Sequence, residues 1–104
     1  MRRKITGEAA LKKFHAKSHG KTIAVCDHDI LGKTFQESDR ILHVPESFYK
    51  DQVVTEEEAV RLINQHDNGI LTGNNIVSFA LKRKLIAEHK KTNGTKYAIY
   101  ARIE

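Results

Sequence analysis

The sequence has few of the residues that mark secreted, membrane-spanning or multidomain proteins. Its 104 residues include one cysteine, one proline and no tryptophan. A single cysteine excludes a disulfide within the chain and agrees with a reducing compartment. No apolar run approaches the roughly 20 residues of a membrane span, and the basic residues 2–4 are not followed by the apolar segment of a signal peptide. We therefore expect a cytoplasmic protein with no membrane partner.

The sequence also lacks a linker. No stretch is rich in proline, serine or glycine, and a length of 104 residues fits one domain. Residues 2–4 are all basic and have little apolar sequence around them, so we interpret residues 1–10 as a loose basic N-terminal arm. Residues 11–104 are predicted to form a single domain.

Motifs for metal or phosphate binding are missing as well. The six histidines are scattered without ligand spacing, and Cys26 with His28 lacks the further ligands that zinc requires. The segment Gly32-Lys33-Thr34 lacks the first glycine of a phosphate-binding P-loop. Cys26 is therefore interpreted as a buried thiol that packs as a small hydrophobic side chain. We predict no metal site and no cofactor.

An enzyme is the least favoured function. It would need Asp27, Asp29 and His43 to converge on His28, whereas carboxylates beside a turn usually act as local caps. A Cys–His nucleophile pair is assembled in space, and the sequence gives no sign of one. We predict that the protein is not an enzyme and has no catalytic residue.

Charge is distributed unevenly along the chain. Residues 1–24 carry seven basic and one acidic side chain, residues 25–60 three basic and nine acidic, and residues 61–104 eight basic and three acidic. The formal net charge is +5. Basic segments at both ends and an acidic middle suggest a two-sided surface, whose basic side favours a polyanion such as RNA.

The first part of the domain has the patterns of strands and turns. Residues 13–17 alternate polar and apolar side chains, which predicts a strand with Phe14 and Ala16 facing inward. Residues 22–26 are apolar and rich in β-branched side chains, and Gly20 lies in the turn between the two segments. We expect a hairpin whose outer face carries a basic strip. The strip consists of Lys13, His15, Lys17 and Lys21.

The middle of the chain is expected to hold a loop, a strand and mixed apolar sequence. Residues 36–39 are polar and predict a loop, and residues 40–44 predict a strand that Pro45 ends. Phe48 is expected in the core and Tyr49 at its edge.

The clearest helix start is at Thr55. Glu58 follows three residues later, as in a capping box, and acidic side chains suit the positive end of the helix dipole. Gly69 is predicted to end this helix in the left-handed conformation. The apolar face of the helix consists of Ala59, Val60, Leu62 and Ile63.

The stretch 71–86 is predicted to form the helix that organises the domain. Its apolar residues recur at helical spacing. Thr72, Asn74 or Asn75 can cap its first turn, and the free N–H groups of Asn74 and Asn75 offer a phosphate site. The cations Lys82-Arg83-Lys84 lie near its C-terminal end, where the helix dipole favours them.

The last part of the chain predicts a second hairpin. Asn93-Gly94 is a strong turn signal, and residues 96–103 alternate with the period of a strand. Tyr100 shares a face with Lys96 and Arg102, where it either stacks on an unpaired base or packs against a strand or helix. Together these elements predict a compact two-layer α+β domain with a mainly antiparallel sheet and two principal helices.

Several segments together resemble a small archaeal family, the domain-of-unknown-function family number 424. The similar segments span roughly residues 12–103. They are Ala24-Val25-Cys26-Asp27, Leu31-Gly32-Lys33 with Phe35, Val44-Pro45-Glu46-Ser47-Phe48-Tyr49, Thr55-Glu56-Glu57-Glu58, and Asn75-Ile76-Val77 with Ala80 and Leu85-Ile86. The resemblance implies a compact two-layer α+β fold and an RNA-binding or translation-associated role, and the family offers no established catalytic residues to carry over. Family members often have glycine where this chain has Lys84.

Two functions are carried forward from the sequence. The first is a small RNA-binding accessory protein associated with translation or the ribosome, in which cations grip phosphates. The predicted nucleic-acid-binding residues are Lys13, Lys17, Lys82, Arg83, Lys84, Lys90, Lys91 and Tyr100. The alternative is a protein–protein interaction module that uses the acidic middle segment without binding RNA.

Overall fold

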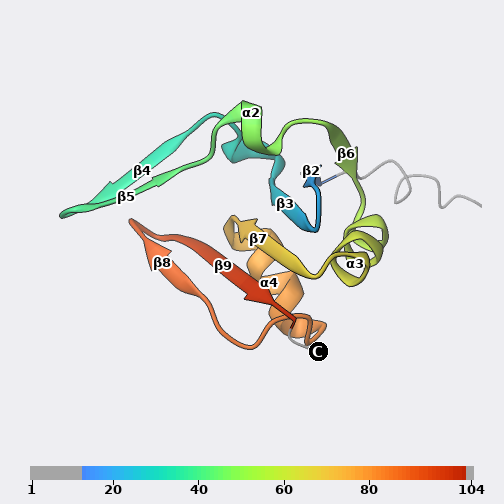
Figure 1. Ribbon diagram of the computed structural model, residues 1–104. Coiled ribbons are helices and arrows are strands. Elements are labelled where there is room, and N and C mark those ends of the chain that lie inside the picture. The colour runs from blue at the N-terminus through green and yellow to red at the C-terminus, as the bar shows by residue number, and fades with distance from the viewer. Residues whose placement is uncertain (1–12, 103–104) are drawn as a thin grey trace, which may run out of the picture.

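A six-stranded mixed sheet forms the centre of the computed structural model, which describes residues 13–102 (Figure 1). The strands lie in the order β6-β2-β3-β7-β9-β8. Their bounds are β2 (Phe14–His19), β3 (Thr22–Asp27), β6 (Gln52–Val54), β7 (Asn68–Thr72), β8 (Lys90–Thr92) and β9 (Thr95–Ala101). Only β3 and β7 pair in parallel, so the prediction of a mainly antiparallel α+β domain is confirmed. The N-terminal arm predicted over residues 1–10 lies outside the described residues.

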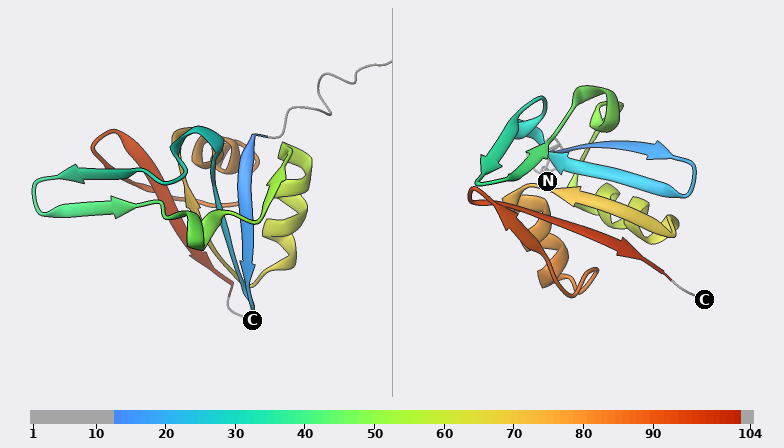
Figure 2. Two further views of the ribbon diagram at one scale, coloured as in Figure 1. Left: turned by 90° about the horizontal axis from the view of Figure 1, so that it is seen from above. Right: turned by 60° about the vertical axis from the view of Figure 1, so that its left-hand side comes forward.

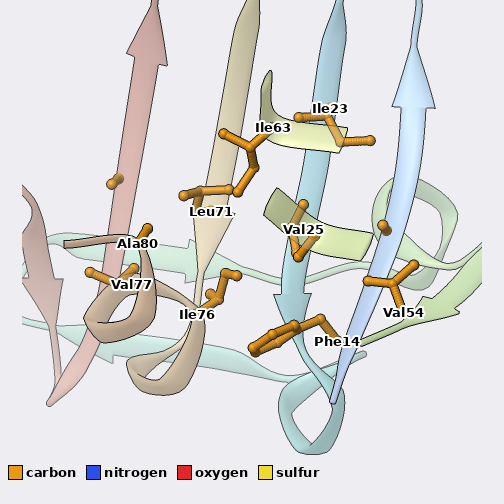
Figure 3. Close-up of a cluster of buried hydrophobic side chains, with 12 residues drawn as sticks. Phe14, Ile23, Val25, Val54, Ile63, Leu71, Ile76, Val77 and Ala80 are labelled. Carbon is orange, nitrogen blue, oxygen red and sulfur yellow. The ribbon is translucent and has the colours of Figure 1, made fainter. Parts of the chain in front are cut away.

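Two helices cover one face of this sheet. They are α3 (Glu56–Gln65) and α4 (Asn74–Lys82), and their apolar sides meet the inward side chains of β2, β3 and β7. Figure 3 shows Ile63 of α3 and Ile76 of α4 converging with Val25 and Leu71 between the layers. All four side chains are fully buried, which makes this cluster the main source of hydrophobic stabilisation.

The opposite face is covered in part by the segment that joins β3 to β6. This segment contains η1 (His28–Ile30), β4 (Thr34–Glu37), β5 (Arg40–His43) and α2 (Glu46–Tyr49). A second apolar cluster lies beneath it and includes Cys26, Val44 and Tyr49. Because both faces of β3 are covered, its residues 23–26 are all buried, and so is Asp27 at its end, whose burial the apolar pattern did not predict.

Strands β4 and β5 form a two-stranded arm that extends away from the main sheet (Figures 1 and 2). The loop predicted over residues 36–39 is too long, because Gln36 and Glu37 pair with β5 and only two residues make the turn. The arm runs beside the β8–β9 hairpin, and the Asn93 N–H donates to Glu37 Oε1 at 2.7 Å.

The prediction that Phe48 lies in the core and Tyr49 at its edge is wrong, because the two residues have the opposite burial. Tyr49 is buried, and its hydroxyl pairs with Thr72 Oγ1 at 2.9 Å, whereas Phe48 is half-buried and stacks on His19. The phenol is accommodated in the interior because a hydrogen-bond partner from β7 satisfies its polar end. The thiol of Cys26 is buried beside it in the same cluster, as predicted.

The start of α3 agrees with its sequence and the end does not. The Glu58 N–H donates to Thr55 Oγ1 at 3.2 Å, and the Thr55 N–H donates to Glu58 Oε1 at 2.9 Å, which completes the capping box. The helix ends at Gln65, where the His66 ring donates to the Leu62 carbonyl at 2.7 Å.

Gly69 is therefore not the helix stop that the sequence suggests. It lies within β7, and a Cβ atom at this position would lie 2.0 Å from a ring carbon of Tyr100. Glycine is required here because an aromatic ring from β9 covers the strand closely.

Helix α4 is shorter than the predicted stretch 71–86. Leu71 and Thr72 belong to β7, where they pair with both β3 and β9. At the other end, the Lys84 N–H donates to the Leu81 carbonyl at 3.1 Å and the Leu85 N–H donates to the Ala80 carbonyl at 2.8 Å. These two bonds form a Schellman motif, and Lys84 takes the left-handed position with φ of 61°. Glycine adopts this left-handed conformation without the strain of a Cβ atom, which Lys84 carries.

Candidate nucleic-acid interface

The first turn of α4 is capped by a residue from a distant strand. Asp27, at the end of β3, accepts the Asn75 N–H at Oδ2 over 2.9 Å and the Ile76 N–H at Oδ1 over 2.8 Å. Burial raises the pKa of the Asp27 carboxyl, and the two N–H bonds oppose that rise. The side-chain caps predicted at Thr72, Asn74 or Asn75 are therefore wrong, since the N-cap is Gly73 and makes no side-chain bond.

Gly73 allows the Asp27 carboxylate to approach the helix. Its φ is 128°, and a Cβ atom there would lie 2.3 Å from Asp27 Cγ. The phosphate site predicted at Asn74 and Asn75 is also wrong, because the carboxylate already occupies the N–H groups of Asn75 and Ile76 and brings its own negative charge.

Asn74 joins α4 to the β8–β9 hairpin. Its side-chain amide donates to the Gly94 carbonyl at 3.1 Å and accepts the Lys96 N–H at 2.8 Å. The Gly73 N–H donates to the Lys96 carbonyl at 2.8 Å. The hairpin turn itself forms at Asn93 and Gly94, both with positive φ, as predicted.

Three lysines from α4 and the hairpin form what we call the basic ridge: Lys82, Lys91 and Lys96. Lys91 lies directly opposite Lys96 on the paired strands. The Lys96 Nζ donates to Ser78 Oγ on α4 at 3.2 Å, and Lys82 follows Ser78 by one helical turn. Among ion pairs within residues 13–102, none involves these three side chains. Like charges directly opposite each other destabilise a sheet, so the hairpin carries an electrostatic cost.

Two other predicted cations pair with the acidic start of α3. Lys13 Nζ lies 3.1 Å from Glu56 Oε2, and Arg83 Nη1 lies 3.7 Å from Glu57 Oε2. The Arg83 guanidinium also lies over the Phe79 ring, 5.4 Å from its centroid. The basic end segments of the chain and its acidic middle segment therefore meet at α3. The surface here carries both positive and negative charges, and the two-sided surface expected from the sequence does not form at this place.

The other predicted residues lie apart from the ridge. Lys17 donates to the Ser47 carbonyl of α2 at 2.9 Å on the opposite face of the sheet. Lys90 pairs with Tyr97 and so points to the opposite side from Lys91. The exposed Lys84 lies just beyond the end of α4.

Tyr100 takes the packing role that the sequence left open. Its hydroxyl donates to the Ile63 carbonyl of α3 at 2.9 Å, and its half-buried ring covers Gly69. The Arg102 guanidinium lies over the same ring, 5.3 Å from its centroid.

The outer basic strip predicted for the first hairpin does not form as a continuous surface. His15 is only 7% exposed, and its ring stacks on that of His28 with centroids 4.8 Å apart. Burial is the main cause that lowers the pKa of His15, and the neighbouring His28 and Lys50 add to it. Strand alternation predicted the face of His15 correctly but could not show that η1 covers it.

A cavity of about 450 Å³ opens beside the ridge. Nine residues line it: Lys13, Phe14, His28, Asp29, Glu56, Asn75, Ser78, Phe79 and Lys82. Two of the predicted nucleic-acid-binding residues, Lys13 and Lys82, are thus brought to the same cavity, and Ser78 connects it to Lys96. Sequence reasoning missed Phe79 and considered His28 and Asn75 only for other kinds of site, because the lining comes from separate elements and has no common spacing along the chain.

Within residues 13–102, no group of three or more histidine, cysteine, aspartate or glutamate side chains is arranged to hold a metal ion. The helices of this part of the chain are also too short or too polar to cross a bilayer.

Comparison with known proteins gives the family and the fold. The family model described as "Protein of unknown function (DUF424)" matches residues 14–103. No curated protein matches the chain. The crystal structure of an uncharacterized conserved protein from Methanopyrus kandleri is similar, with a TM-score of 0.59 and 21% identity over 88% of this chain and 93% of that chain. Since the family model spans nearly all described residues, the chain belongs to the DUF424 family.

Proposed function

We propose that the protein binds RNA through the basic ridge and acts as a cytoplasmic accessory protein of translation that associates with the ribosome. The observation that carries this proposal is the placement of Lys91 opposite Lys96, with Lys82 nearby on α4. The repulsion between these ammonium groups destabilises the free protein. A polyanion that bridges them relieves this repulsion, which favours its binding.

One lysine of the ridge, Lys96, is held in place before any ligand binds. The backbone of Lys96 bonds to Asn74 and Gly73, and its ammonium bonds to Ser78. A fixed group loses less conformational entropy on binding than a free lysine. Phosphate contacts of this kind give affinity that falls with salt and depends little on sequence.

The test is charge reversal on the ridge. The double variant Lys82→Glu with Lys91→Glu is expected to weaken RNA binding on all sequences alike, and to reduce the slope of log affinity against log salt by about 1.4 for single strands. The matched control is Lys21→Glu with Lys33→Glu, which changes the net charge equally. Both control positions are exposed. Lys21 lies in the β2–β3 turn, and its carbonyl accepts the Asn68 N–H at the start of β7, whereas α4 follows the other end of that strand. Equal losses in the two double variants, or none in either, would refute the proposal.

The single variant Lys91→Glu separates binding from folding. It places opposite charges across β8 and β9, so the free energy of unfolding is expected to rise by about 0.2–1 kcal/mol. RNA affinity is expected to fall in the same protein. A variant that loses stability and affinity together would point to a damaged fold instead.

Association with the ribosome is tested by co-sedimentation of the native protein with ribosomal particles. Release by high salt and by nuclease is the expected result. A partner retained in nuclease-treated extract would instead favour the protein-interaction function. That function is less supported, because Glu37, Glu56 and Glu57 of the acidic segment already bond to Asn93, Lys13 and Arg83.

A further inference from the structure

We propose that the cavity beside α4 takes one unpaired nucleotide of the bound RNA strand, with its base stacked on His28. This inference rests on the proposed RNA binding and deepens it, because it names single-stranded RNA as the substrate. The volume of about 450 Å³ lies in the range of small-ligand sites. The evidence comes from the rings, the polar groups and the cations of the lining.

A stack of two rings already stands at the wall of the cavity. His15 and His28 lie nearly parallel, with an interplanar angle of 15° and centroids 4.8 Å apart. His15 is buried, and His28 is exposed and lines the cavity. Since His15 uses only one face of the His28 ring, the other face can take a third ring. Stacking of unpaired bases on aromatic side chains is the common way that proteins read single-stranded RNA.

Phe79 adds an aromatic surface on the α4 side. It lines the cavity together with Phe14, and the two ring centroids are 6.3 Å apart. The Arg83 guanidinium lies over the Phe79 ring. Phe14 is buried behind Phe79, so the partly exposed ring of Phe79 on α4 supplies the apolar surface, which suits a flat base better than a phosphate alone.

Polar groups suited to a base edge face the same space. The side-chain amide of Asn75 makes no hydrogen bond within the described part of the chain, whereas its backbone N–H donates to Asp27 Oδ2. An amide presents one donor and one acceptor site together, and a carboxylate such as that of Asp29 accepts from exocyclic amino groups. Glu56 is already paired with Lys13, which reduces its repulsion of a nearby phosphate.

Lys82 connects the cavity to the ridge. It lines the cavity and belongs to the ridge, and Ser78 lies in the cavity wall while accepting from Lys96. A strand that follows the ridge with its phosphates therefore passes the mouth of the cavity, where one base can turn inward.

The experiment compares a single-stranded RNA oligonucleotide with an abasic strand of equal length, which has the same phosphates but no bases. Native protein is expected to bind the base-bearing strand about tenfold more tightly, as one lost stacking contact implies. The variant His28→Ala is expected to lose most of this difference and to leave the affinity for the abasic strand unchanged. Asn75→Ala is expected to reduce the same difference, because it removes the amide that bonds to the base edge. The fold is expected to be retained, since the backbone bond of residue 75 to Asp27 does not need the side chain.

The matched control is His43→Ala, an exposed histidine on the β4–β5 arm that bonds to Thr34 and does not line the cavity. It is expected to bind both strands as the native protein does. Thermal unfolding of each variant verifies that the fold is retained, and the ring protons of His28 are expected to shift upfield in NMR spectra when the base-bearing strand is added.

The outcomes distinguish the two proposals. If both strands bind equally well and ridge variants weaken both, the RNA proposal stands and the nucleotide cavity is overturned. If neither strand binds, both proposals are overturned. Loss of affinity for both strands in His28→Ala also contradicts the cavity, because that residue would then act through the fold and not through the base.

Discussion

Lys84 occupies a backbone position that glycine would occupy at lower cost. Its φ of 61° lies in the left-handed region, and its N–H and that of Leu85 close the Schellman motif that ends α4. An L-residue in this conformation crowds its Cβ against the following carbonyl, whereas glycine has no Cβ. Lys84→Gly is therefore predicted to stabilise the protein, although it removes a side chain and adds chain flexibility.

The magnitude follows from two opposing terms. Relief of the left-handed conformation is worth about 1–2 kcal/mol. Glycine also increases the conformational entropy of the unfolded chain, which offsets about 0.5–1 kcal/mol of this stabilisation. The net gain relative to Lys84→Ala is then about 0.5–1 kcal/mol, because both variants lose the same charge near the helix end. For a domain of this size, that corresponds to a rise in Tm of about 2–8 °C.

The assay is equilibrium unfolding in denaturant together with calorimetry, on the native protein and on three variants. Lys84→Ala removes the charge and keeps the Cβ, so it is the direct reference for Lys84→Gly. Lys82→Gly places glycine in the last helical position of α4 and is expected to destabilise by about 0.5–1 kcal/mol. If Lys84→Gly proves no more stable than Lys84→Ala, the left-handed conformation is not a source of strain and the reasoning fails.

Two further predictions concern Asp27 and Cys26. Gly73→Ala is expected to destabilise by about 3–5 kcal/mol, because a Cβ atom would displace the Asp27 carboxylate from α4 in addition to straining the backbone. Denaturant unfolding measures this, and a loss below about 1 kcal/mol would contradict it. Burial raises the pKa of Cys26 to about 12, with the charge of Asp27 as a smaller cause. The folded protein therefore holds this proton more tightly than the unfolded chain, so stability should be complete below about pH 9 and decline as the pH rises toward 12. Cys26→Ala should decline less steeply over that range, and an identical decline would show that the thiol does not contribute.

Features with local causes could be predicted from the sequence. The capping box at Thr55 and Glu58 needs only residues three positions apart, and the turn at Asn93 and Gly94 needs only two residues that accept positive φ. The burial of Phe14 and Ala16 follows from strand alternation in the same way.

The loop predicted over residues 36–39 and the C-terminal end of α4 were wrong for local reasons, whereas the other errors involve partners that are distant in the chain. Gly69 has the composition of a helix stop, yet it is a strand residue beneath Tyr100. Tyr49 enters the core because Thr72 of β7 meets its hydroxyl. Of the candidate interface, the sequence indicated Lys82 and Lys91, whereas Lys96 joined them only through pairing of β8 with β9.

What the sequence determined alone was where α3 begins and where the β2–β3 and β8–β9 hairpins turn, since short-range hydrogen bonds and side-chain periodicity fix those points. The tertiary structure decided how α4 starts and what lies beside it. The cap of that helix comes from Asp27, 48 positions before Asn75, and the cavity lining comes from β2, η1, α3 and α4. Such contacts depend on packing across the sheet, because a carboxylate reaches a free helix N–H only after both elements are in place.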